Sequence, residues 1–175
     1  MKADNLLYVE LNFIKEFIYD KCSLYLTNLK LNLESAEYAA GTFELNGLKI
    51  INRIYKITPK KTGQFVAIWK RNENGITEPF DIVDDFDIII ITSKNNERIG
   101  QFIFPKLVLA VKGIITQNKK DGKRRVRVYP TWDIVTNIQS EKTQNWQTKY
   151  FVEIKSDNTI DLNLIKKLFI QTLKN

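Results

Sequence analysis

Four consecutive isoleucines, Ile88 to Ile91, are the feature that most constrains the fold. Successive side chains of a strand point to opposite faces of a sheet, so a continuous apolar run is typical of a strand that is buried on both faces. Such a sheet needs covering elements on each side. The sequence therefore predicts an α/β (α+β) fold, with a central mixed β-sheet flanked by helices.

Other segments supply those elements, and at 175 residues they form a single domain, 1–175, with a sizeable core. Alternating patterns predict strands at 42–45, 48–57, 64–71, 100–106 and 150–154, and Asn46-Gly47 predicts a two-residue hairpin between the first two. Helical periodicity predicts helices at 5–20, 137–149 and 161–173, the first two capped by Asn5 and Thr136, with a short helix over 34–41. Segment 107–115 is apolar and suits either a helix or a strand.

The stretch from Lys119 to Trp132 combines a turn with a two-faced, cationic strand. Asp121-Gly122 predicts a hairpin turn. The residues after it alternate, so that one face carries three cations and a phenol and the other is mostly apolar; the first face is formed by Lys123, Arg125, Arg127 and Tyr129. A solvated outer face and a phosphate-binding surface both fit this pattern.

Charge is sorted into blocks along the chain. The formal net charge is +7, from 27 Lys plus Arg against 20 Asp plus Glu. Residues 49–71 and 112–127 are strongly basic, whereas 73–87 carry acids and no cation. Separate basic segments favour a polyanionic partner.

Two absences exclude whole classes of site. The chain has no histidine and one cysteine, Cys22, which excludes the usual zinc sites and Ser-His or Cys-His nucleophile pairs. A lone cysteine fits a reducing cytoplasm. No apolar run is long enough for a membrane span, so we expect a cytoplasmic protein that needs no cofactor.

The acidic block nevertheless raises a metal hypothesis. Asp81 and Asp87 precede the isoleucine strand, where the nuclease fold named after its PD-(D/E)xK motif places its first acid. The next strand ends in Phe104-Pro105-Lys106, which supplies the lysine but replaces the second acid by phenylalanine. A catalytic set would therefore depend on Glu37, Asp81, Asp87 and Lys106, with Mg²⁺ held by the acids. A solvated loop that caps its own backbone explains the same acids.

Several motifs, in order along residues 36–151, resemble the MepB family. They are Ala36-Glu37-Tyr38, Lys61-x-Gly63-Gln64-Phe65-Val66-x-x-Trp69-Lys70-Arg71, Pro79-Phe80-Asp81, Gly100-Gln101-Phe102-x-Phe104-Pro105-Lys106, Gly122-Lys123-Arg124-x-x-Arg127-Val128-Tyr129-Pro130-x-Trp132 and Thr143-Gln144-x-Trp146-Gln147. The resemblance implies a bacterial, cytoplasmic protein with a core like that of type II restriction endonucleases. It also implies no intact catalytic set and weak binding of nucleic acid.

We therefore expect a protein that binds nucleic acid, in the first place DNA, weakly or without sequence specificity, on a catalytically degenerate nuclease-like core. Phosphates would meet Lys56, Lys60, Lys61, Lys70, Arg71, Lys106, Lys123, Arg125 and Arg127, and bases or sugars would meet Tyr129, Trp132, Gln139 and Gln147.

Two alternatives stay open from the sequence. The first is a metal-dependent nuclease with the unusual acid set given above. The second is a non-catalytic interaction protein that binds an acidic partner or ligand near the amide-rich and aromatic helix side between Gln139 and Tyr150. Cleavage with Mg²⁺ or Mn²⁺ distinguishes the first, and salt-dependent binding of nucleic acid argues against the second.

Overall fold

The central sheet is mixed, as expected, and has six strands in the part of the chain that the computed structural model describes, residues 9–31, 40–57, 61–96 and 98–173. Its order is β1 (Leu26–Leu31), β2 (Gly41–Leu45), β3 (Leu48–Ile54), β8 (Ile88–Asn95), β9 (Arg98–Pro105) and β11 (Phe151–Ile154). Only β3 and β8 run parallel; the other neighbours in this sheet are antiparallel. The predicted Asn46-Gly47 hairpin joins β2 and β3, with positive φ at both residues.

The isoleucine run lies in β8 and is buried on both faces of the sheet, which confirms the prediction. Ile88 and Ile90 belong to one core cluster, and Ile89 and Ile91 belong to the other. All four side chains are fully buried. The central sheet therefore separates two hydrophobic cores.

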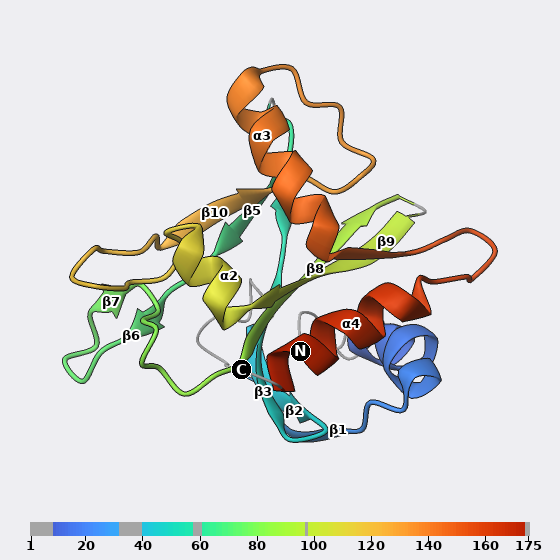
Figure 1. Cartoon of the computed structure of the whole chain (residues 1–175), viewed down its shortest axis with the longest axis horizontal. Helices are drawn as coiled ribbons and strands as arrows, with labels where there is room; N and C mark the ends of the chain where they lie inside the picture. Colours follow the sequence, from blue (N-terminus) through green and yellow to red (C-terminus); the bar gives the residue numbers. More distant parts are fainter. Residues whose placement is uncertain (1–8, 32–39, 58–60, 97, 174–175) are drawn as a thin grey trace.

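Helices cover one face (Figure 1). The first described helix runs from residue 9 to 14, continues as a π-helix, Lys15–Tyr19, and ends in a 3-10 turn, Asp20–Cys22. Helix α4 (Leu162–Leu173) lies beside it, and Asp161 caps its start by accepting the Leu164 N–H at 2.9 Å. Ile14, Ile18 and Ile165 are fully buried under this layer. The predicted helices at both ends of the chain are thus present, although Asn5 lies outside the described residues.

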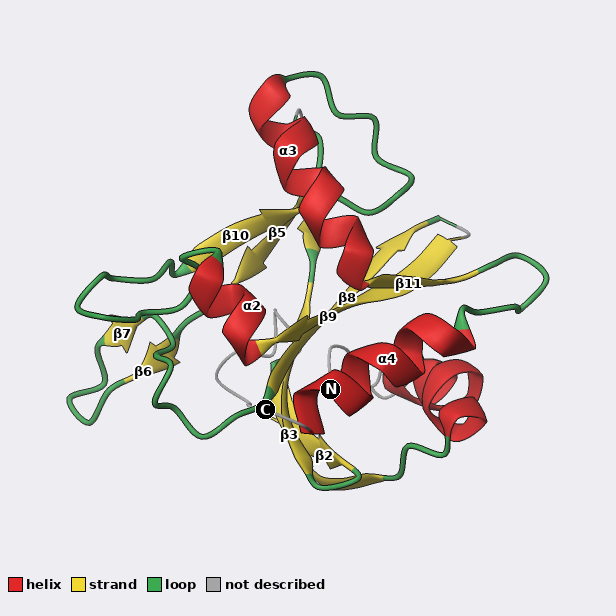
Figure 2. Ribbon diagram, in the orientation of Figure 1, coloured by secondary structure: helices red, strands yellow, loops and turns green. Residues whose placement is uncertain are grey.

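The other face carries a smaller sheet and two helices (Figure 2). Strands β10 (Arg125–Val128), β5 (Gln64–Ala67) and β4 (Lys56–Ile57) form that sheet in this order. Val66 and Val128 are buried against the central sheet. Segment 107–115 proves to be helical over α2 (Lys106–Val111), and α3 (Ile138–Gln147) continues as a 3-10 turn, Thr148–Tyr150.

Several expectations about local structure are wrong. The predicted strand 48–57 is divided, because β3 ends at Ile54 in the central sheet and β4 belongs to the smaller sheet. The predicted strand 64–71 is divided: β6 (Lys70–Arg71) leaves β5 and pairs with β7 (Thr77–Glu78) instead. The turn before β10 is formed by Asn118 and Lys119, with φ of 53° and 62°, and not by Asp121-Gly122. Gly122 is needed for close approach, because a Cβ there would lie 2.6 Å from the Thr116 nitrogen.

The cap of α3 is also shifted by one residue from the prediction. Asn137, not Thr136, accepts the Ser140 N–H at 2.9 Å. The expected helix over 34–41 falls largely outside the described residues, as do Glu37 and Lys60. Among the described helices, none has both the length and the apolarity that a membrane crossing requires.

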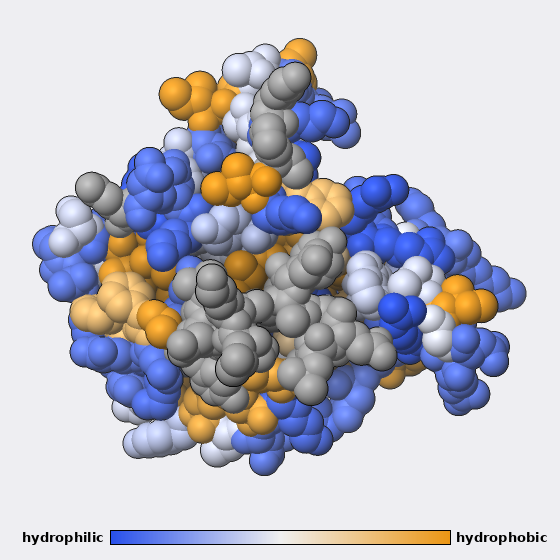
Figure 3. Space-filling view, turned by 180° about the vertical axis from the view of Figure 1, so that it is seen from behind, coloured by the Kyte–Doolittle hydropathy of each residue, from blue (hydrophilic) through white to orange (hydrophobic). Residues whose placement is uncertain are grey.

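The surface seen from behind is mostly hydrophilic where described residues are visible, and apolar side chains appear there in small separate groups (Figure 3). Scattered apolar side chains of this kind are normal on a folded protein. On this face, the described residues therefore form no broad apolar surface.

Candidate nucleic-acid interface

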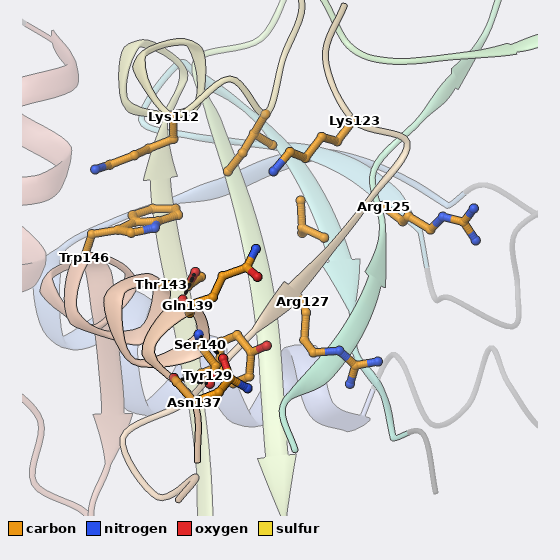
Figure 4. A pocket seen from close by; sticks show the side chains of 12 residues that line it. Lys112, Lys123, Arg125, Arg127, Tyr129, Asn137, Gln139, Ser140, Thr143 and Trp146 are labelled. Carbon is orange, nitrogen blue, oxygen red and sulfur yellow. Dashed lines mark hydrogen bonds between the residues drawn. The ribbon is translucent and has the colours of Figure 1, made fainter. Parts of the chain in front are cut away.

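A groove of about 500 Å³ lies between β10 and α3 (Figure 4). Its volume is within the range of about 300–1,000 Å³ that is usual for ligand sites. The described residues that line it are Lys112, Ile114, Lys123, Arg125, Val126, Arg127, Tyr129, Asn137, Gln139, Ser140, Thr143 and Trp146. The groove thus joins the two regions that the sequence singled out separately, the cationic strand and the amide-rich helix side.

The wall between β10 and α3 is held by one buried amide. Gln147 is 2% exposed. Its Nε2 donates to the Arg127 carbonyl at 3.0 Å, and its Oε1 accepts the Tyr129 N–H at 2.9 Å. Because β10 is an edge strand, these two bonds satisfy backbone groups that no neighbouring strand covers. Gln139, Ser140, Thr143 and Trp146 follow at helical spacing and so face the groove together.

The groove is cationic. Lys112, Lys123, Arg125 and Arg127 all line it, and no carboxylate is among its described lining residues. Figure 4 shows the Lys123 side chain extending to the α3 side of the strand, whereas the two guanidinium groups extend to the other side. The groove is therefore one part of a wider basic surface.

That surface continues on the outer face of the small sheet. Lys56 pairs with Phe65, and Phe65 pairs with Arg127, so the three residues form one row across β4, β5 and β10. The Arg127 guanidinium donates to the Gly63 carbonyl at 2.8 Å. Val66 and Val128 point inward from the same strands, so the predicted alternation is confirmed within β10. Lys123 departs from the prediction, because it precedes the strand and extends to the α3 side.

Comparison with known proteins shows the family of the chain. The profile of the MepB-like family matches residues 32–153. The chain belongs to the MepB-like family. The crystal structure of MepB has a similar fold, with a TM-score of 0.70 and 34% sequence identity, over 73% of this chain and 86% of that one. No curated protein matches the chain.

The aromatic residues of this MepB-like protein are divided between the groove and the core. Trp146 lines the groove, and the Lys112 ammonium lies 5.3 Å from its ring centroid. Trp132 was expected to contact nucleic acid but lies elsewhere. Its ring packs on Phe151 at 5.3 Å, Arg98 covers it at 4.9 Å, and its Nε1 is buried. Trp132 is therefore a partly buried residue that packs against the core beside Phe151 of β11.

Gln147 must also leave the set of contact residues, because it is buried and both ends of its amide are bonded to β10. Gln139 and Tyr129 remain in the groove. Beside them, burial raises the pKa of the Asp133 carboxyl, and a hydrogen bond from the Gly63 backbone partly offsets the shift.

Several predicted phosphate-binding cations lie apart from the groove. Lys70 forms ion pairs with Glu78, at 3.3 Å, and with Asp84. Arg71 covers the Trp69 ring at 5.4 Å. Lys61 is exposed, at the start of the described segment before Gly63. The structure therefore brings Lys56, Lys123, Arg125 and Arg127 together and leaves Lys70 in an acidic environment.

In this MepB-like protein, the Asp81 and Asp87 carboxylates of the metal hypothesis accept hydrogen bonds from backbone N–H groups. Asp87 Oδ2 accepts the Lys49 N–H at 2.7 Å, and Asp81 Oδ1 accepts the Val83 N–H at 3.1 Å. Lys106 donates its ammonium to the Asp84 carbonyl at 2.6 Å. Within the described segments, no three carboxylate, thiol or imidazole groups are gathered as a metal site requires.

Phe104, which stands where the nuclease motif has its second acid, is buried and lies 5.3 Å from the Trp146 ring. It thus forms the floor on which α3 packs. Thr143 and Trp146 line the groove although they were not predicted as contact residues. Both lie on the amide-rich and aromatic side of the helix that the sequence had indicated. Lys112 had one sequence signal, its place at the start of the basic block 112–127, but its position could not be predicted because its segment fitted a helix or a strand equally.

Proposed function

We propose that this protein binds nucleic acid, in the first place DNA, weakly and without sequence specificity, in the bacterial cytoplasm. The observation that carries the proposal is the groove itself, with four cations and no carboxylate among its described lining residues. Nucleic acids are the polyanions for which such surfaces are typical.

The shape of the basic surface supports contact with a backbone rather than with a single ion. The cations extend from Lys112, directly after α2, through Lys123 and across β10 to Lys56 on β4. Phosphate contacts of this kind give affinity without reading sequence. The rings of Phe65, Tyr129 and Trp146 offer apolar surface beside the cations, which suits bases and sugars.

The test is a pair of matched charge reversals. Arg125→Glu with Arg127→Glu changes the proposed surface, and Lys166→Glu with Lys167→Glu makes the same change in net charge on exposed residues of α4. The first pair should weaken oligonucleotide binding at least tenfold and lower the slope of log affinity against log salt by roughly two contacts. The second pair should have a much smaller effect. Fluorescence anisotropy at several salt concentrations measures both.

Equal losses from the two pairs would mean that net charge alone drives binding, and the groove would not be the site. No binding by the unchanged protein at low salt would reject the proposal and favour an acidic protein or ligand. The folded state of each variant is checked by circular dichroism before the titration.

The nuclease-like core is part of the same proposal. The antiparallel hairpin β8–β9 brings Asp87 and Lys106 together, since the Lys106 N–H donates to the Asp87 carbonyl at 2.9 Å. Phe104 cannot hold a cation, and the Asp81 and Asp87 carboxylates are engaged with backbone N–H groups. We therefore expect no cleavage of plasmid or single-stranded substrate with Mg²⁺ or Mn²⁺, and cleavage abolished by Asp87→Asn would support the nuclease alternative instead.

A further inference from the structure

The two walls of the groove differ in which polar groups are available to a ligand. On α3, the Ser140 hydroxyl donates to the Asn137 carbonyl and the Thr143 hydroxyl donates to the Gln139 carbonyl. Asn137 Oδ1 accepts the Ser140 N–H. The Gln139 amide, in contrast, makes no hydrogen bond within the described residues, and it points into the groove (Figure 4). Its amide is therefore available to a ligand in the groove.

Two lysines lie on this side of the groove. Lys123 extends toward α3, and Lys112 lies over the Trp146 ring at its edge (Figure 4). Neither ammonium forms an ion pair with a carboxylate of the described residues. An ammonium is a compact point charge with three donors, and it suits a phosphate that carries more than one negative charge.

Arg125 and Arg127 differ from the lysines in position, because they extend to the far side of β10. Arg127 belongs to the row with Phe65 and Lys56 on the outer face. These residues suit the phosphodiesters of a strand that passes over the sheet, each with one negative charge. The groove as a whole, lined by both the lysines and the arginines, has a volume of about 500 Å³, so one small group of a longer ligand fits within it.

We infer that the α3 side of the groove holds a terminal phosphate of the nucleic acid, a phosphomonoester bound by the Lys123 ammonium and the Gln139 amide. A phosphomonoester carries about 1.5 to 2 negative charges at neutral pH, against one for a phosphodiester, and so gains more from the Lys123 ammonium and from the positive charge of Lys112 at the edge of the groove. The inference rests on the proposed function, since the outer face holds the adjoining strand.

The experiment compares oligonucleotides that differ only at one end. One pair, labelled at the 3′ end, carries either a 5′-phosphate or a 5′-hydroxyl; the mirror pair carries a 3′-phosphate or a 3′-hydroxyl. The phosphate should raise affinity about tenfold at one of the two ends, the gain expected of a charge-assisted contact. Anisotropy at constant salt gives the ratio of the two affinities.

Single substitutions distinguish contacts made on the α3 side of the groove from contacts made on the outer face of the small sheet. Lys123→Gln should reduce the ratio of phosphate to hydroxyl affinity to near one. Arg125→Gln, the matched control two residues along the chain, should weaken both ligands alike and leave the ratio unchanged. Gln139→Ala should lower the ratio by a smaller factor, because an amide provides a weaker contact than an ammonium does.

The outcomes distinguish this inference from the proposed function. Equal affinity for phosphate and hydroxyl ends, with binding retained, overturns the inference and leaves the proposed function standing. If Lys123→Gln leaves the ratio of phosphate to hydroxyl affinity unchanged, the inference is also overturned. A free nucleoside monophosphate that binds as tightly as the phosphorylated strand also overturns it, because the ligand would then be a free nucleotide. Absence of binding by every oligonucleotide rejects both proposals.

Discussion

Gly63 lies at a position where any side chain would disturb the basic surface. Its φ is 84°, and a Cβ there would lie 2.5 Å from the Tyr129 ring and 2.8 Å from Arg127 Cγ. The absence of a side chain lets both residues lie over the turn, where the Gly63 carbonyl accepts from the Arg127 guanidinium. One glycine thus positions two residues of the site.

We predict that Gly63→Ala weakens oligonucleotide binding several-fold, whereas Gly47→Ala does not. Gly47 is a matched control, because its φ is 83° and a Cβ added there would have nothing within 4 Å. Both changes should lower the free energy of unfolding by about 1–2 kcal/mol through backbone strain, and Gly63→Ala should lower it further through the clash. Denaturant unfolding and anisotropy measure the two effects; equal stability losses and unchanged affinity would show that Tyr129 and Arg127 move aside at no cost.

At the scale of elements, α3 replaces a missing strand neighbour of β10. Gln147 bonds to both Arg127 and Tyr129, and Gln144 Nε2 donates to the carbonyls of Pro130 and Asp133, each at 2.9 Å. The two amides that the sequence suggested as ligand contacts therefore have different roles. Gln147 is buried and holds the strand, whereas Gln139 faces the groove.

Gln147→Ala should lower the free energy of unfolding by about 2–4 kcal/mol, since it leaves two buried backbone groups without partners at about 1–3 kcal/mol each. It should also weaken oligonucleotide binding, because the width of the groove depends on this contact. Gln139→Ala, on the same helix, should change stability by less than about 0.5 kcal/mol. Urea unfolding of the two variants provides the check, and similar midpoints would show that water replaces the amide.

The elements that could be predicted were those with a strong local pattern. The isoleucine run, the alternation in β10 and the amphipathic α4 all follow from spacing alone. The division at Ile68 and Trp69 could not be predicted, because it depends on partners: Arg124 accepts from the Ile68 N–H, whereas Lys70 pairs with Glu78. Asp121-Gly122 was misleading for the same reason, since its glycine serves a contact with segment 114–116.

At the scale of the whole molecule, the central sheet separates the site from the N-terminal helix and α4. The basic surface is assembled from β4 and β5, from α2 through β10, and from α3, which are distant in sequence. Cationic and amide-rich segments could each be recognised in the sequence. That they meet could not, because their meeting depends on α3 packing over Phe104 and along the edge of β10.

The charge of the whole chain leads to a last prediction, that binding responds steeply to salt and hardly to pH. The chain has no histidine, and its formal net charge is +7. Burial lowers the pKa of Arg53 to about 10, so that this guanidinium is still charged at pH 8. Histidine is the side chain that ordinarily titrates between pH 6 and 8, so its absence removes the usual source of pH dependence.

The affinity for a hydroxyl-ended oligonucleotide should therefore change by less than about threefold between pH 6 and 8. Raising salt from 50 to 200 mM should lower it by about a hundredfold if four phosphates are contacted. Anisotropy over a grid of pH and salt measures both dependences. A strong pH dependence would contradict this account and direct attention to Asp133, whose carboxyl has a raised pKa and accepts from the Gly63 backbone beside the groove.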